Sequence, residues 1–137
     1  MQTDIKDYKK WLRAKIDENN LNYRKVGESI GYSTQSVFAW STEGMQDATM
    51  YALDCLLNKF NSHLEIKGKR IDILEFGYWL RAYLHYEGIS YCDFAKKVGL
   101  GERFLYNLKK RPTVAFHTLL KILDELNLTI YIVEGKK

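Results

Sequence analysis

Residues 23–40 read YRKVGESIGYSTQSVFAW, two short amphipathic runs separated by a glycine. Val26 and Ile30 are four residues apart, so they share one face of a helix. Gly31 ends that helix, and Val37 and Trp40, three residues apart, give the following helix its buried face. The pattern predicts two helices that meet at a rigid corner.

The opposite side of the second helix carries small or hydrogen-bonding side chains and no carboxylate: Ser33, Thr34, Gln35, Ser36 and Ala39. A face of this kind suits insertion into the major groove of DNA. Thr34 and Gln35 have the chemistry to read base edges, and Ala39 can contact a thymine methyl group.

The same pattern recurs 68 residues downstream, which indicates an internal repeat. Between residues 4–40 and 72–108, eight of 37 positions are identical, and four of them (WLRA) are consecutive. After residue 40 the offset becomes 66 and the apolar pattern stays in phase. We therefore expect two units, residues 1–68 and 69–137. The identical pairs are Asp4/Asp72, Ile5/Ile73, Trp11/Trp79, Leu12/Leu80, Arg13/Arg81, Ala14/Ala82, Tyr23/Tyr91 and Gly31/Gly99.

Capping residues predict where the helices of each unit begin and end. The expected N-caps are Asp4, Asn22 and Asp47 in the first unit and Asp72, Ser90 and Thr113 in the second. The expected stops are Asn19–Asn20 with Asn61 in the first unit and Gly88 with Asn127 in the second. The outward-facing helices are predicted at residues 34–42 and 102–110. Short strands follow at 63–66 and 128–133, and Lys67, Gly68 and Lys69 suit a hairpin tip.

Composition is typical of a folded, mildly basic protein. Of the 137 residues, 46% are hydrophobic, and the net charge of +4 arises entirely in residues 69–137, which favours contact of that half with a polyanion. Cys55 and Cys92 are interpreted as reduced core residues. The sequence has no signal peptide and no membrane-span pattern, so we expect a cytoplasmic protein.

With these residues in view, each unit resembles the helix-turn-helix domain of the phage Cro/CI repressor family, also called the XRE family. In the second unit, Phe94, Ala95, Gly99, Leu105 and Leu108 stand at the family's core positions, and residues 112–128 match its trailing helix. The resemblance implies a mainly α fold of two tandem lambda-repressor-like helix-turn-helix units, each followed by a short β-strand.

The resemblance also implies which residues contact double-stranded DNA. Base contacts are expected from Ser33, Thr34, Gln35 and Ala39 in the first unit, and from Gly101, Glu102, Arg103 and Asn107 in the second. Phosphate contacts are expected from Tyr23, Ser36, Tyr91, Lys109, Lys110 and Arg111. Arg103 would favour guanine and Asn107 adenine.

Several of these residues have a simpler interpretation. Trp11, Trp40 and Trp79 suit the core better than a stacking surface. Thr34 and Gln35 also suit ordinary exposed helix positions, and Lys109, Lys110 and Arg111 a solvated patch. Acidic residues, Glu43 and Asp47, flank the region of the first unit that would approach phosphates. That unit is therefore either a DNA reader or a protein-binding or dimerising unit.

The function expected is that of a sequence-specific DNA-binding transcriptional regulator, a repressor of phage or mobile-element type. The alternatives are an antitoxin that binds a toxin and represses its own operon, and a protein-interaction module that has lost DNA binding. No Gly-rich phosphate loop, nucleophile motif or zinc signature is present, so we expect no enzyme and no cofactor. His63, His85 and His117 are scattered, so no metal site is expected.

The strands that follow the two units suggest how the units are joined. They can pair with each other within one chain about a pseudo-twofold axis, which would hold two different reading faces on an imperfectly palindromic operator. Alternatively, their exposed edges pair between chains and form a homodimer.

Overall fold

Eight α-helices make up most of the computed structural model, which describes residues 2–44, 48–108 and 115–135. The first four are α1 (Tyr8–Glu18), α2 (Tyr23–Ile30), α3 (Thr34–Thr42) and α4 (Met50–Lys59). The second four are α5 (Phe76–Tyr86), α6 (Tyr91–Val98), α7 (Glu102–Asn107) and α8 (Phe116–Leu126). The strands are β1 (Gln2–Asp4), β2 (Ser62–Ile66), β3 (Lys69–Ile71) and β4 (Ile130–Glu134). The expectation of a mainly helical fold is confirmed.

The order of elements in residues 2–66 recurs in residues 69–134: a strand, a 3-10 turn, four helices and a strand. The 3-10 turns are η1 (Ile5–Asp7) and η2 (Ile73–Glu75). Asp4 and Asp72 cap them, because their carboxylates accept hydrogen bonds from the backbone N–H of Lys6 and Leu74 at 3.0 and 2.9 Å. The two halves of the chain therefore use matching residues for matching local structure.

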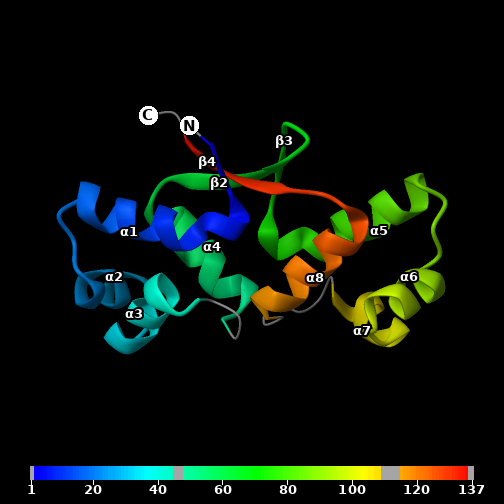
Figure 1. Ribbon diagram of the computed structural model, residues 1–137, viewed down its shortest axis with the longest axis horizontal. Helices are drawn as coiled ribbons and strands as arrows, with labels where there is room; N and C mark the ends of the chain where they lie inside the picture. Colours follow the sequence, from blue (N-terminus) through cyan, green and yellow to red (C-terminus); the bar gives the residue numbers. More distant parts are fainter. Residues whose placement is uncertain (1, 45–47, 109–114, 136–137) are drawn as a thin grey trace.

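The central strands β2 and β4 are antiparallel neighbours in a sheet with the order β1-β4-β2-β3 (Figure 1). Their register places Glu65 opposite Tyr131 and Ile66 opposite Ile130. Glu65 and Tyr131 are 66 residues apart, which is the offset of the sequence alignment in this region. The pairing is therefore centred on equivalent residues, and the expectation that the two trailing strands pair within one chain is confirmed.

A second contact on the same symmetry lies at the start of the last helix of each half. Thr49 and Ala115 form an isolated antiparallel bridge, and these two residues are also 66 apart. The backbone N–H of Phe116 donates to the carbonyl oxygen of Ala48 at 2.7 Å. The halves thus meet through equivalent residues at two separate places.

The sheet and the outward-facing helices lie on opposite sides of the molecule. Figure 1 shows the sheet along one side, α4 and α8 in the middle, and α3 and α7 on the other side at the two ends of the long axis. This layout leaves both outward-facing helices available on one side.

The sheet differs from the expected pair of strands. The three-residue strand β1 was not predicted, and β3 completes the hairpin that the Lys67–Gly68 turn begins. Both central strands therefore have both edges occupied, β4 by β1 and β2 by β3. In the described chain neither trailing strand therefore leaves a free edge for another chain, and a homodimer formed in this way stays a prediction.

The starts of α4 and α8 also differ from expectation. These helices begin at Met50 and Phe116, with Thr49 and Ala115 as their N-caps. Asp47 and Thr113, the caps that were predicted, lie outside the described residues. Thr49 takes the capping role because its hydroxyl accepts the backbone N–H of Ala52 at 3.1 Å. The other predicted caps, Asn22 and Ser90, are confirmed.

One continuous hydrophobic core includes residues from both halves. Trp11 and Trp40 are buried in it, as predicted, whereas Trp79 is half-buried and stacks on Phe76 with ring centroids 5.4 Å apart. Cys92 is exposed near the start of α6 rather than buried, which corrects its assignment to the core. Among the described residues no helix has the length and apolar character needed to span a membrane.

Candidate nucleic-acid interface

The first helix corner joins α2 to α3 and is built from three capping residues. Asn22 accepts the backbone N–H of Lys25 at 2.8 Å and starts α2. Gly31 ends α2 with a φ of 80°, a left-handed conformation that glycine adopts without strain. Ser33 starts α3 by accepting the backbone N–H of Ser36 at 3.1 Å. These local interactions set the direction of α3 relative to α2.

Gly27 allows the corner to be tight. The backbone N–H groups of Gly31 and Tyr32 both donate to the Gly27 carbonyl oxygen at 2.9 Å. A Cβ atom at Gly27 would lie 2.5 Å from the carbonyl oxygen of Tyr32, which is backbone and cannot turn away. The buried face of α2 is therefore in direct contact with the chain that leads into α3.

The outward side of α3 carries the residues predicted to read bases. Thr34 and Gln35 are exposed, and Ala39 is half-buried. Ser33 is exposed, but its hydroxyl already caps the helix and lies 2.9 Å from the hydroxyl of Ser36. Both serine hydroxyls are thus engaged with each other at the helix N-terminus, so their expected DNA contacts compete with a structural role.

Phe38 was missed by the sequence reasoning. It lies one turn after Thr34 on α3, and 49% of its surface is exposed. The ring of Tyr23 packs edge-on against it with centroids 5.3 Å apart. Tyr23, predicted as a phosphate contact, is therefore a half-buried support for an exposed apolar side chain. The spacing of four from Thr34 was the signal that places Phe38 on the outward face.

The second corner joins α6 to α7 in the same manner. Ser90 accepts the backbone N–H of Asp93 at 3.1 Å, and Gly99 ends α6 with a φ of 71°. The backbone N–H of Leu100 donates to the Ala95 carbonyl oxygen at 3.0 Å. Ala95 is the residue aligned with Gly27, so this corner accommodates one more carbon atom than the first.

Charged residues distinguish α7 from α3. Glu102 and Arg103 are exposed in the first turn of α7, Gly101 is its N-cap, and Asn107 is half-buried at its end. α3 has no charged residue. Lys109, Lys110 and Arg111, predicted to contact phosphates, lie outside the described residues. Tyr91, also predicted to do so, is half-buried at the start of α6.

Two exposed lysines at the end of α6 were not predicted to take part. Lys96 and Lys97 occupy the last turn of α6, immediately before the corner at Gly99. The aligned residues of α2 are Glu28 and Ser29, and Glu28 lies 3.9 Å from Arg24 in an exposed ion pair. The last turn of α6 therefore carries two lysines at positions where α2 has Glu28 and Ser29.

The structure thus divides the predicted residues into two groups, one on α3 and one on α7, and does not bring them together into a single pocket. The two groups lie at opposite ends of the same side of the molecule (Figure 1). Such an arrangement can contact one long ligand at two places.

Comparison with known families characterises residues 80–131 within the second half. Residues 80–131 match the family model of the Cro/C1-type HTH DNA-binding domain. These residues form a Cro/C1-type HTH domain. The Cro/C1-type domain contains all of α6, α7 and α8, and with them Arg103 and Asn107. The match does not extend to residues 1–79. No curated protein and no solved structure matched the chain.

Proposed function

We propose that the chain is a sequence-specific double-stranded DNA-binding transcriptional regulator, a repressor of phage or mobile-element type. The observation that carries this proposal is the Cro/C1-type domain at residues 80–131, with Arg103 exposed on its outward helix. Arg103 would read guanine through bidentate hydrogen bonds and Asn107 adenine. Lys96 and Lys97 would add phosphate contacts that fix the register without reading sequence.

We infer further that residues 1–68 form one helix-turn-helix unit and that residues 69–137 form another. Support comes from the repeated order of elements, from the matching corners at Gly31 and Gly99, and from the pairing of Glu65 with Tyr131. Proteins of this class usually place two recognition helices about 34 Å apart by forming a dimer. Here one chain would carry both helices, with no metal or other cofactor.

The two recognition helices would read different half-sites. α3 offers Thr34, Gln35 and Ala39, whereas α7 offers Glu102 and Arg103, so the same base pairs cannot satisfy both. The operator is therefore an imperfect palindrome. DNA binding would also depend on residues that position or support the recognition helices, namely Ser33, Ser36, Tyr23 and Tyr91. Phosphate contacts would come from the charged residues Lys109, Lys110 and Arg111.

Selection of bound duplexes from a random pool tests the proposal directly. We expect enrichment of one duplex class with two dissimilar half-sites, centred about 10 base pairs apart. Affinity for that duplex should fall by orders of magnitude between about 50 and about 200 mM salt, because phosphate contacts release counterions. Failure to enrich any sequence would overturn the proposal, and a strictly symmetric site would overturn the assignment of two different readers.

A second candidate function applies to the first half alone, which would bind a protein rather than DNA. Phe38 favours it, because its apolar ring is 49% exposed on the outward face of α3, a helix that carries no charged residue. Footprinting with the selected duplex separates the two functions. Protection of one half-site only would assign DNA binding to the second half and leave Phe38 to a protein partner. A toxin as that partner has no supporting observation of its own.

A further inference from the structure

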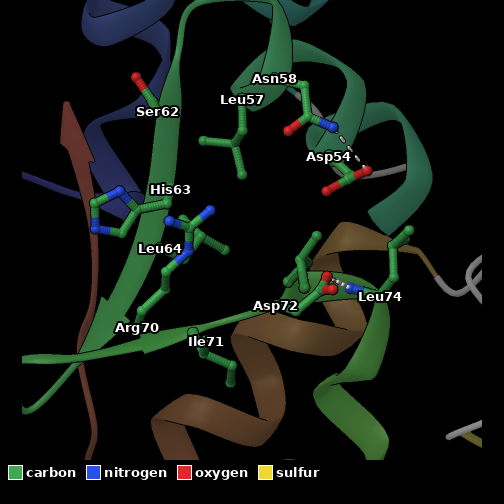
Figure 2. Close-up of a pocket in the computed structure, with 11 residues that line it drawn as sticks. Asp54, Leu57, Asn58, Ser62, His63, Leu64, Arg70, Ile71, Asp72 and Leu74 are labelled. Carbon is green, nitrogen blue, oxygen red and sulfur yellow. Dashed lines mark hydrogen bonds between the residues drawn. The ribbon is translucent and has the colours of Figure 1, made fainter. Parts of the chain in front are cut away.

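A cavity of about 240 Å³ lies between α4, the β2–β3 hairpin and η2 (Figure 2). Leu57, Leu64 and Ile71 form its apolar lining. Its polar lining includes two carboxylates and a guanidinium group, from Asp54, Asp72 and Arg70. In the view of Figure 2, Arg70 approaches from the hairpin and Asp54 faces it from α4 across the cavity. The lining thus offers charges of both signs together with apolar surface.

The charges in this cavity are not paired with one another. The Asp54 carboxylate accepts a hydrogen bond from the Asn58 amide at 3.3 Å, and the Asp72 carboxylate accepts the Leu74 backbone N–H at 2.9 Å. Within the described residues neither carboxylate forms an ion pair, and Arg70 forms none. Partial burial raises the pKa of Asp54, and the charge of Asp72 raises it further. The site therefore holds two carboxylates and one guanidinium group, none of them in an ion pair within the part of the chain that the structure describes.

A cation is present at the equivalent junction between the two halves, where η1 of the first half meets α8 of the second. There, the Lys6 ammonium of η1 lies 2.9 Å from the Asp124 carboxylate of α8. The residues aligned with this pair are Leu74 and Asn58, which form no ion pair with each other. An exposed lysine ammonium thus bridges the junction between η1 and α8. At the equivalent junction between η2 and α4, which contains Asp54, the aligned residues Leu74 and Asn58 carry no charge.

We propose that this cavity binds a small zwitterion of amino-acid size, its ammonium group between Asp54 and Asp72 and its carboxylate on Arg70. The ammonium would supply a positive charge at this junction, as Lys6 does at the junction between η1 and α8. Guanidinium groups bind carboxylates with two parallel hydrogen bonds, which favours a carboxylate over other acceptors. At about 30 Å³ per water molecule, the volume corresponds to about eight non-hydrogen atoms, the size of a small amino acid.

The ligand would connect the two halves of the chain. α4 contributes Asp54 from the first half, and Asp72 stands at the start of η2 in the second. A molecule bound to both carboxylates joins the helix that follows α3 to the turn that precedes α5. Binding therefore stabilises the folded chain as a whole, which makes thermal unfolding a direct readout.

The test measures the Tm of the full chain, without DNA, in the presence of glycine, alanine, serine and threonine at millimolar concentrations. We expect at least one of them to raise the Tm in a saturable manner, by about 5–15 °C at about 100 times its Kd. Propionate and ethylamine, which each lack one of the two charges of alanine, should give no such shift. If none of the four amino acids raises the Tm, the proposal is wrong.

Two variants and a matched control locate the site. Asp54→Leu puts at this position the residue type found at the aligned position of the other half, Leu120. Asp54→Asn keeps the side chain's shape while removing its charge. Both should abolish the ligand-induced shift. Asp124→Asn removes a carboxylate at the equivalent junction of the other half and should retain the shift. A shift that survives in both Asp54 variants would overturn the assignment. Because no DNA is present, the result is independent of the proposed regulator function.

Discussion

At the scale of single residues, Arg103 is the side chain on which the proposed reading of DNA depends most. It is exposed in the first turn of α7, within the Cro/C1-type domain. Arg103→Ala should cost about 1–3 kcal/mol at the cognate site and relax the preference at one base position. Competition binding with single-base variants of the selected duplex measures both effects.

Lys69→Ala is the matched control for Arg103, since it also removes one exposed positive charge but lies in β3, on the sheet side of the molecule. Its affinity for the cognate duplex should change little. Equal losses for Lys69→Ala and Arg103→Ala would mean that only overall charge matters, and α7 would then not be a reading helix.

Gly27 carries a second prediction at this scale. An added methyl group would meet the Tyr32 carbonyl oxygen at 2.5 Å, and the clash should outweigh the better helix propensity of alanine. We expect Gly27→Ala to lower the free energy of unfolding by about 1–3 kcal/mol, measured by denaturant titration. Ser29→Ala, an exposed change in the same helix, should stay within about 0.5 kcal/mol. A neutral Gly27→Ala would show that the corner relaxes.

Sequence reasoning placed Thr34 and Gln35 on the outward side of α3 and missed Phe38. Thr34 and Gln35 were found because they follow a capping serine and alternate with the buried Val37 and Trp40. Phe38 was overlooked because apolar residues were assigned to the core, and only packing against Tyr23 leaves its ring outside. The Asp54 cavity arises from residues far apart in the chain, so local patterns do not indicate it.

At the scale of elements, Lys15 and Glu134 join α1 to the end of β4. The Lys15 ammonium donates to the Glu134 carboxylate, and the Lys15 side chain is only 10% exposed. Burial lowers the pKa of Lys15, but the hydrogen bonds to Glu134 and Glu18 and the charges of both carboxylates together more than offset this, so its pKa is raised. The bond to Lys15 lowers the pKa of Glu134 below 4.5. The pair thus anchors the last strand of the chain to the first long helix.

Glu134→Gln should remove this anchoring. Since the folded-state pKa of Glu134 is below its unfolded value, its contribution is present above about pH 4.5 and is lost as the pH falls through the folded pKa. We expect a loss of about 1 kcal/mol at pH 7, discounted for the partial exposure of Glu134, and a smaller loss below pH 4. Denaturant titrations across this pH range measure it.

Glu18→Gln provides the control, because Glu18 also approaches Lys15, at 3.4 Å, but is 60% exposed. Its effect on stability should be smaller than that of Glu134→Gln at every pH. The reverse order would show that the contact with β4 contributes nothing.

The boundaries of the elements show what local chemistry can and cannot predict. The start of α3 was predicted because Gly31, the left-handed end of α2, and the capping Ser33 lie immediately before it. Asp47 was predicted as the N-cap of α4, since aspartate and threonine both cap helices well. In the structure Thr49 is the N-cap, and it also forms the bridge to Ala115, a contact that local sequence does not indicate. β1 has three residues and no alternating pattern, and its structure depends on its partner β4.

At the scale of the whole molecule, the two halves are joined by the pairing of β2 with β4, and both outward-facing helices lie on the same side of the chain. We expect a single chain to bind a single selected duplex, with a complex of one chain to one duplex in sedimentation measurements. Occupancy should then follow a simple hyperbola in chain concentration, because no assembly step precedes binding. Two chains per duplex, or a sigmoidal curve, would show that the functional unit is a dimer.

The edge strand β1 has a consequence for the order of the halves. Because Gln2 lies opposite Val133, the first and last strands are neighbours, and a short linker would bridge them. The exposed turn at Lys67 and Gly68 offers a place for new ends. A circular permutant opened there would begin with the Cro/C1-type half and finish with the other, yet keep every strand pair. Which half is synthesised first is thus a matter of gene arrangement rather than of architecture.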